Sequence, residues 1–157
     1  MERVEFLTIQ HYLGKTQNEM ARLLGCSLKA IQSFEQRKIN ISVHVERQVL
    51  IFLYLKKAPD VRFRPCWEIL NCQAETRQRC LTWEFQAWNI RWFINGTFCH
   101  GQTQEDLKKK MEMCRECGVF QTTLPLLFQR SFGDQSKINF TYNAIQYCSV
   151  SMRCFQI

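Results

Sequence analysis

The chain has 157 residues, nine cysteines and a formal charge of +7 at neutral pH. That length suits one ordinary domain or two small ones, and the positive charge favours an anionic partner such as nucleic acid or an acidic membrane face. The first residues lack the apolar run of a secretory signal, and the most apolar stretch, Val49 to Leu55, is far shorter than the roughly 20 residues that cross a bilayer. We therefore expect a soluble cytoplasmic protein with no membrane partner, whose cysteines are thiols, metal ligands or redox sensors.

Charge and cysteine content divide the chain. Residues 1–57 hold nine Lys/Arg, five Asp/Glu and one cysteine. Residues 58–120 hold nine Lys/Arg, eight Asp/Glu and six cysteines. Two prolines interrupt the helical pattern between these parts and predict a linker over 58–65. We expect an N-terminal domain over 1–57, a cysteine-rich module over 66–120 and a tail of uncertain structure over 121–157.

The stretch KTQNEMARLLGCSLKAIQSFE predicts two short helices around one glycine. Thr16 and Glu19 have the spacing of a capping box, which starts the first helix at Gln17. Gly25 supplies the left-handed residue that ends this helix. The inward residues of the first helix are Met20, Ala21 and Leu24.

A second short helix follows, capped by Ser27 and with Ile31 and Phe34 turned inward. Helices this short are marginal alone, so they need neighbours to pack against. Glu5 to Tyr12 and Ser42 to Lys57 are predicted helices that can supply this cover.

These residues resemble the lambda-repressor and Cro type of helix-turn-helix. The resemblance implies a compact domain of four or five helices that binds double-stranded DNA, with the second short helix in the major groove. Single corners of this type usually bind two half-sites, so we expect a homodimer with half-sites about 34–36 Å apart. One departure is Arg37, which stands where the family often has glycine. The resemblance implies that Leu28, Lys29 and Ser33 read bases, with Gln32 as a helper, and that Gln17 meets a phosphate. Arg37, Lys38 and Asn40 are predicted to bind phosphates, and Ser27, at the start of the second helix, is also a predicted DNA contact. The alternatives are a helical hairpin that only builds a core, or one that binds protein.

Six cysteines follow in the second part, at Cys66, Cys72, Cys80, Cys99, Cys114 and Cys117. Only the last pair has a short ligand spacing. We expect it on one face of a helix that is capped by Thr103, has Asp106 at its third position and ends at Gly118. Asn95-Gly96, between two short apolar runs, predicts a β-hairpin that turns at these two residues.

The segments CWEILNC, RCLTWEF, RWFINGTFCHG and CRECGVF are similar to the cysteine-rich module called the two-CW domain. The resemblance covers about 65–120 and implies a small α+β module. The first Cys-Trp pair stands here as Cys66-Trp67, but the second reads Arg91-Trp92, so one expected thiol is missing.

Four thiolates around zinc or an iron–sulfur cluster would stabilise a module with little aliphatic core. The six cysteines are therefore candidate metal ligands. Redox-active thiols or disulfides, and buried cysteines without ligands, stay open as alternatives.

We expect a sequence-specific DNA-binding transcriptional regulator with a metal-binding or redox-sensing module. The first alternative is a protein-binding adaptor with a zinc-stabilised module. A thiol-dependent enzyme is the other alternative, but the sequence shows no clear base, Ser/His/Asp set or phosphate-binding glycine loop, so we expect no catalysis and no small-molecule substrate. The tail after residue 120 fits either an accessory strand-rich segment or an altered reading frame.

Overall fold

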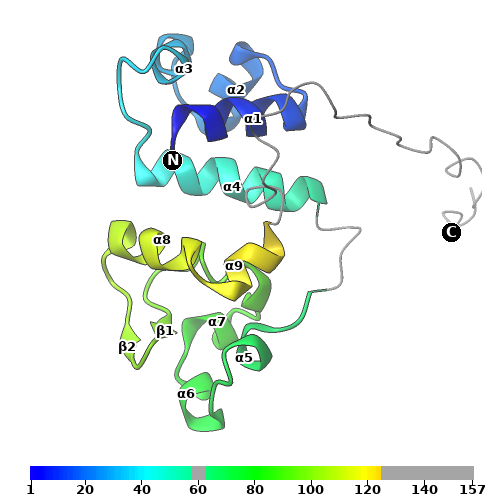
Figure 1. Ribbon diagram of the computed structural model, residues 1–157, viewed down its shortest axis with the longest axis vertical. Coiled ribbons are helices and arrows are strands. Elements are labelled where there is room, and N and C mark those ends of the chain that lie inside the picture. The colour runs from blue at the N-terminus through cyan, green and yellow to red at the C-terminus, as the bar shows by residue number, and fades with distance from the viewer. Residues whose placement is uncertain (58–62, 125–157) are drawn as a thin grey trace, which may run out of the picture.

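The computed structural model describes residues 1–57 and 63–124, and in these ranges the protein is mainly helical with one small two-stranded sheet (Figure 1). Most of the predicted linker and the predicted tail beyond residue 124 lie outside the described residues. The first four helices are α1 (Arg3–Leu13), α2 (Gln17–Leu24), α3 (Leu28–Glu35) and α4 (Val43–Lys57). The remaining elements are α5 (Cys66–Ile69), α6 (Ala74–Gln78), α7 (Leu81–Glu84), the short 3-10 helix η2 (Trp88–Ile90), β1 (Phe98–Cys99), β2 (Gln102–Thr103), α8 (Leu107–Arg115) and α9 (Gly118–Thr123).

The corner between α2 and α3 forms as its local chemistry predicts. The Thr16 hydroxyl accepts a hydrogen bond from the backbone N–H of Glu19 at 3.3 Å, and the Glu19 carboxylate accepts one from the backbone N–H of Thr16 at 2.8 Å. Gly25 ends α2 with φ +61°, and Ser27 caps α3 by accepting from the backbone N–H of Ala30 at 3.1 Å. The predicted start of α2, the glycine turn and the Ser27 cap are confirmed.

Arg37 takes the left-handed backbone conformation, with φ +57°. The chain leaves α3 there, and the backbone N–H of Lys38 donates to the carbonyl oxygen of Ser33 at 2.9 Å. This backbone conformation is strained for a residue with a Cβ. Arginine therefore occupies a position that suits glycine.

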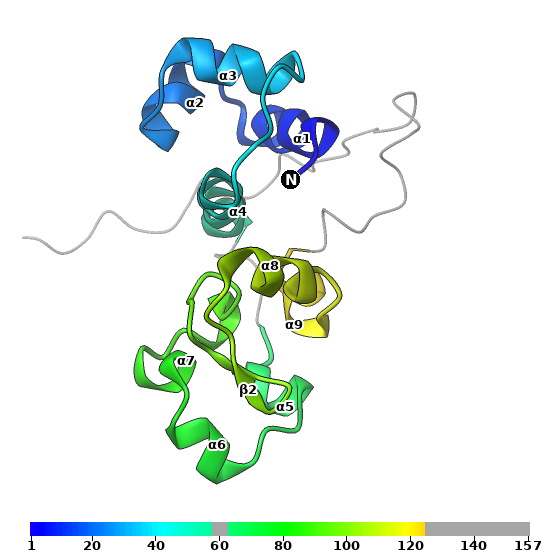
Figure 2. The ribbon, with the colours of Figure 1, turned by 90° about the vertical axis from the view of Figure 1, so that its left-hand side faces the viewer.

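Helix α4 lies between two layers of the molecule. Figures 1 and 2 show α1, α2 and α3 on one side of α4, and α8 and α9 on the other. Val49, Leu50 and Leu53 are almost fully buried in α4. On the same helix, Arg47 donates to the carbonyl oxygen of Phe93 and stacks over the Phe93 ring, with its guanidinium carbon 4.6 Å from the ring centre. Both sides of α4 are thus covered.

One apolar cluster runs through both layers. Phe6 packs edge-on against Phe34 in the first layer, with ring centres 5.9 Å apart, and Trp92 packs edge-on against Phe120 in the second, at 5.6 Å. The buried members of this cluster are Phe6, Ile9, Leu13, Met20, Ala21, Leu24, Ile31, Phe34, Val49, Leu50, Leu53, Trp92, Met111, Cys114, Phe120 and Leu124. The two predicted parts of the chain therefore share a core.

The limits predicted for the cysteine-bearing helix are wrong at both ends. Asp106, not Thr103, caps α8, because its carboxylate accepts from the backbone N–H of Lys109 at 3.0 Å while Thr103 is held in β2. At the other end α8 stops at Arg115, and Gly118 begins α9. Leu124, which follows α9, is 1% exposed, so the packed structure continues four residues beyond the predicted module.

The hairpin turn is also misplaced in the prediction. The strands β1 and β2 pair antiparallel, with Phe98 opposite Thr103, and the turn is His100-Gly101. Both turn residues have positive φ, +51° and +78°, as the tight hairpin turn that matches the strand twist requires. Asn95 lacks positive φ, so Asn95-Gly96 cannot form this turn.

None of the helices in the described ranges has the length and apolar character that crossing a bilayer requires.

Candidate functional site

The outer side of α3 carries the side chains predicted to read bases. Ile31 and Phe34 are buried on the inner side of α3, while Lys29 is exposed and Leu28 is 37% exposed. Ser33 is half-buried, and its hydroxyl donates to the carbonyl oxygen of Lys29 at 2.8 Å. The ammonium group of Lys29 makes no hydrogen bond or ion pair with any described residue, so it is available to a ligand.

Two glutamines that were predicted to contact DNA are held within the protein. Gln17 donates to the Glu35 carboxylate at 2.5 Å, and Gln32 donates to the amide oxygen of Gln17 at 3.5 Å. Glu35 is tied further, because its backbone carbonyl accepts from Arg3. These bonds fix the start of α2 against the end of α3. Ser27 is likewise occupied as a helix cap, although it is exposed.

The loop after α3 presents three of the predicted phosphate ligands. Arg37, Lys38 and Asn40 are all exposed, and none of their side chains has a partner among the described residues. Two positive charges and an amide thus lie next to the outer side of α3. A phosphate backbone along this side would meet them without displacing any internal bond.

In the second half of the molecule, five of the six predicted metal ligands lie near Arg91. This arginine precedes the fully buried Trp92 and is itself only 5% exposed. Its charge acts on the thiols of five of the six predicted ligands, which are Cys66, Cys80, Cys99, Cys114 and Cys117. Cys72, the sixth predicted ligand, contributes to raising the pKa of Cys66. The cysteines are therefore brought together, with a guanidinium among them.

The pKa values of these groups reflect burial and the arginine charge. Burial raises the pKa of the Cys66 and Cys99 thiols, and the charge of Arg91 only partly opposes this. Burial also raises the pKa of Cys80. Hydrogen bonds with Phe98 and Thr82, together with the charge of Arg91, lower it by more, so the pKa of Cys80 lies below its ordinary value. Thiols of one cluster thus differ in their tendency to ionise.

A second buried cation lies beside this cluster. Lys110 on α8 is 1% exposed, and its ammonium donates to the hydroxyl of Thr97 at 2.7 Å, to the carbonyl oxygen of Arg91 at 3.1 Å and to that of Ile94. Burial lowers the pKa of Lys110 to about 8. Burial also raises the pKa of Cys114, one turn away, to about 11.

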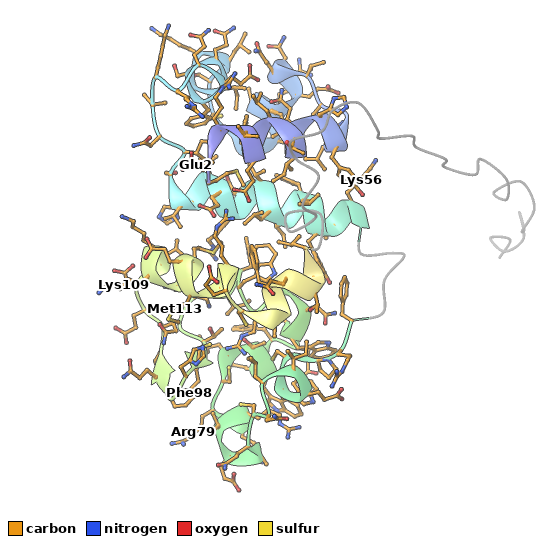
Figure 3. The ribbon with its side chains drawn as sticks, in the orientation of Figure 1. Glu2, Lys56, Arg79, Phe98, Lys109 and Met113 are labelled. Carbon is orange, nitrogen blue, oxygen red and sulfur yellow. The ribbon has the colours of Figure 1, made fainter. Side chains whose placement is uncertain are left out.

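Lys110 and Arg91 line one small cavity of about 10 Å³, roughly the space of a single water molecule. Figure 3 shows α8, with Met113 labelled, over the hairpin that carries Phe98. The other lining residues are Thr97, Cys99, Gln104, Met113, Cys114 and Cys117.

The arrangement does not fit a metal ion well. A zinc or iron–sulfur site needs three or four thiolates directed at one point. Within residues 1–57 and 63–124, no group of three or more His, Cys, Asp or Glu side chains is arranged to hold a metal ion. Arg91, which is positively charged like a metal ion, lines the same small cavity as Cys99, Cys114 and Cys117.

Aromatic rings cover the outer end of this region. Trp67 packs edge-on against Trp83 and Trp88, with ring centres 5.1 and 5.3 Å apart. Arg77 lies over Trp67 and Trp83, 5.4 Å from each ring centre. The tryptophans therefore cover a part of the chain with few aliphatic side chains.

Arg115 connects the cysteine-bearing half to the helical corner. It lies between Cys114 and Cys117 and bonds the carboxylates of Glu5 on α1 and Glu46 on α4. Glu46 also pairs with the amino group of Met1 at 2.7 Å.

The sequence prediction missed Arg91, Lys110 and Arg115. Only Arg91 gives a sequence signal, since it stands at a position where a cysteine is expected. Comparison of the chain with protein-family models, curated proteins and solved structures finds no match.

Proposed function

We propose that the protein is a DNA-binding transcriptional regulator that reads the major groove with α3, as a helix-turn-helix. The observation that carries this proposal is the division of α3 into two sides. Ile31 and Phe34 anchor the inner side, and the outer side presents Leu28 and an unpaired Lys29. Lysine suits the acceptor atoms of guanine, and leucine suits a thymine methyl group.

The surroundings of α3 support the same proposal. Arg37, Lys38 and Asn40 are exposed directly after it, where phosphate contacts would position the helix. Gln17 and Gln32 also help to hold the corner, because Gln32 donates to Gln17 at 3.5 Å and so links α3 to α2. We propose Leu28, Lys29 and Ser33 as the main base readers, and the DNA contacts of Gln17 and Gln32 stay part of the proposal.

A role in sensing is proposed for the cysteine-rich half. Arg115 lies two residues before the half-buried Cys117 and bonds one carboxylate on α1 and another on α4. A chemical change at the Cys117 thiol that moves Arg115 would alter the support beneath the corner. This thiol would in this way regulate DNA binding.

Selection from a random DNA library, followed by titration of the selected duplex, tests the main proposal. We expect two related half-sites about 34–36 Å apart, bound by two copies of the chain. The variant Lys29→Glu should lose at least tenfold in affinity, because it replaces a donor with a like charge at the phosphate-rich groove.

Lys109→Glu is the matched control, because Lys109 is an exposed lysine on α8, in the other layer of the molecule (Figure 3). It makes the same change in net charge and should leave the affinity within about twofold if the effect is local. Circular dichroism verifies that both variants fold. Equal losses in the two variants, or no enriched sequence at all, would contradict the proposal.

The adaptor alternative rests on the same exposed side of α3. It predicts that no DNA sequence is enriched and that Lys29→Glu instead weakens a protein complex.

A further inference from the structure

The cysteine cluster contains a fixed positive charge, the guanidinium of Arg91. Arg91 is 5% exposed. Its charge interacts electrostatically with the thiols of Cys99, Cys66, Cys117 and Cys80. These thiols come from α5, from the start of α7, from β1 and from the turn between α8 and α9. Four separate segments therefore meet around one guanidinium.

Arg91 has no acidic partner among the described residues. Its guanidinium donates to the carbonyl oxygen of Phe98, at 3.2 Å from Nη2, and its charge partly opposes the rise that burial causes in the pKa of Cys66. A buried guanidinium is costly unless polar groups surround it. Here the polar groups that surround it are sulfur atoms and a backbone carbonyl, so the cysteines solvate the arginine.

A second cation makes the same region unfavourable for a metal ion. Lys110 is 1% exposed, and with Arg91 it lines the cavity bounded by Cys99, Cys114 and Cys117. A divalent ion in this cavity would approach two positive groups in a poorly screened interior, where like charges repel strongly. Three thiols face the cavity, but so do both cations.

We propose that the guanidinium of Arg91 is the resident cation of the cysteine cluster, standing among the thiols where a metal ion would otherwise bind, so that this half of the protein folds without zinc or iron. The buried positive charge that a structural metal ion would provide is here provided by Arg91. This inference does not depend on DNA binding, and it is an alternative to the zinc or iron–sulfur cofactor that the cysteine count leads us to expect.

The full-length chain, purified in reducing buffer without oxygen, provides the first test. We expect elemental analysis to find zinc and iron far below one atom per chain, and no visible absorption from a cluster. A strong chelator should leave the thermal midpoint unchanged. One zinc or iron atom per chain, with a fall in the thermal midpoint on chelation, would overturn the proposal.

Titration with cobalt(II), whose bonds to thiolates absorb visible light, provides the second test. The wild-type chain and Arg91→Lys, which keeps a positive charge, should both show no such bands. Arg91→Cys removes the cation and adds a thiol at the centre, so this variant should gain them. Cobalt bands in the wild-type chain as strong as those in Arg91→Cys would show that the arginine does not exclude a metal. Circular dichroism of each variant confirms that folded chains are compared.

Discussion

Arg115 and Glu5 form a two-pronged ion pair, in which Nη1 donates to Oε1 and Nη2 to Oε2, each at 3.0 Å. The two residues are 110 positions apart in the chain and lie on α8 and α1. The same arginine bonds Glu46, whose side chain is only 7% exposed. One side chain from the cysteine-rich half therefore holds two helices of the other half.

Arg115→Ala should lower the free energy of unfolding by about 2–3 kcal/mol. The figure lies below the roughly 3–5 kcal/mol for a broken buried pair, because the Arg115 side chain is 29% exposed and solvent screens part of the interaction. Denaturant titration measures the change. Arg79→Ala is the control, because Arg79 is an exposed arginine on the far side of the cysteine-rich half, with no ion pair in the described structure, and should change stability by less than about 0.5 kcal/mol (Figure 3). Equal effects of the two substitutions would argue against the bridge.

Thr16→Ala should cost about 1 kcal/mol, since it removes the side chain that caps α2. Thr8→Ala is a suitable comparison, because the Thr8 hydroxyl bonds only to the carbonyl of Val4 within its own helix, α1. It should be nearly neutral. Thermal unfolding followed by circular dichroism distinguishes the two, and a loss from Thr8→Ala as large as that from Thr16→Ala would contradict the assigned cap.

The capping box should also show in the response to acid. The backbone N–H and hydroxyl of Thr16, and then the charge of Lys15, hold the pKa of Glu19 below its ordinary value of 4.5. A carboxyl with a lowered pKa in the folded state stabilises the fold above its unfolded pKa, and this contribution disappears as the pH falls through the folded value. Titration of the Glu19 carboxyl by NMR should give a higher pKa in Thr16→Ala than in the wild-type chain. An unchanged pKa would mean that the Thr16 hydroxyl does not bond the Glu19 carboxylate in solution, because the backbone N–H of residue 16 remains in the variant.

Arg37→Gly should stabilise the protein and weaken its binding to DNA. Glycine relieves the left-handed strain at φ +57°, for a gain of about 1 kcal/mol. Loss of the exposed charge should reduce the slope of log affinity against log salt by about 1. Lys38→Gly also removes one positive charge, so it should weaken DNA binding in the same way. The φ of Lys38 is not positive, so this substitution relieves no strain and should lower the free energy of unfolding, in contrast to Arg37→Gly. A gain in stability from both substitutions would rule out relief of strain as the cause.

The cysteines should react with iodoacetamide at different rates. Burial raises the pKa of Cys114 to about 11, and the Cys114 side chain is 7% exposed, so its reactive thiolate should be rare and shielded at neutral pH. Cys80 is half-buried and its pKa is below the ordinary value, so it should be alkylated well before Cys114. Mass spectrometry of peptides after timed labelling checks the order. The difference should vanish in denaturant, and faster labelling of Cys114 in the folded chain would contradict the structure.

The N-terminal helices could be predicted from the sequence because their ends depend on neighbouring residues. The cap at Thr16 needs only Glu19 three positions later, and the end of α2 needs only a glycine at Gly25. The burial pattern of α4 was harder to predict. Leu50 is fully buried beside Val49, because a second layer packs against α4 and covers more than one stripe of this helix.

The cysteine-rich half was less predictable because distant residues decide its turns. Asn95-Gly96 and His100-Gly101 both suit a hairpin, and the sequence alone favours the first. Lys110 resolves the choice, because its ammonium binds the carbonyl oxygens of Arg91 and Ile94 and so draws the 91–94 segment into turns. The meeting of the cysteines around Arg91 likewise depends on how four segments pack, which no local spacing encodes.

The position of α4 between two layers limits how the chain can be shortened. A fragment that stopped at Lys57 would keep the four helices of the corner but would bare the side of α4 that packs on α8 and the neighbouring loop. Such a fragment should self-associate or melt at a lower temperature than the whole protein, because newly wetted apolar surface drives aggregation. The helices proposed to contact DNA therefore depend on packing against the cysteine-bearing half for part of their stability.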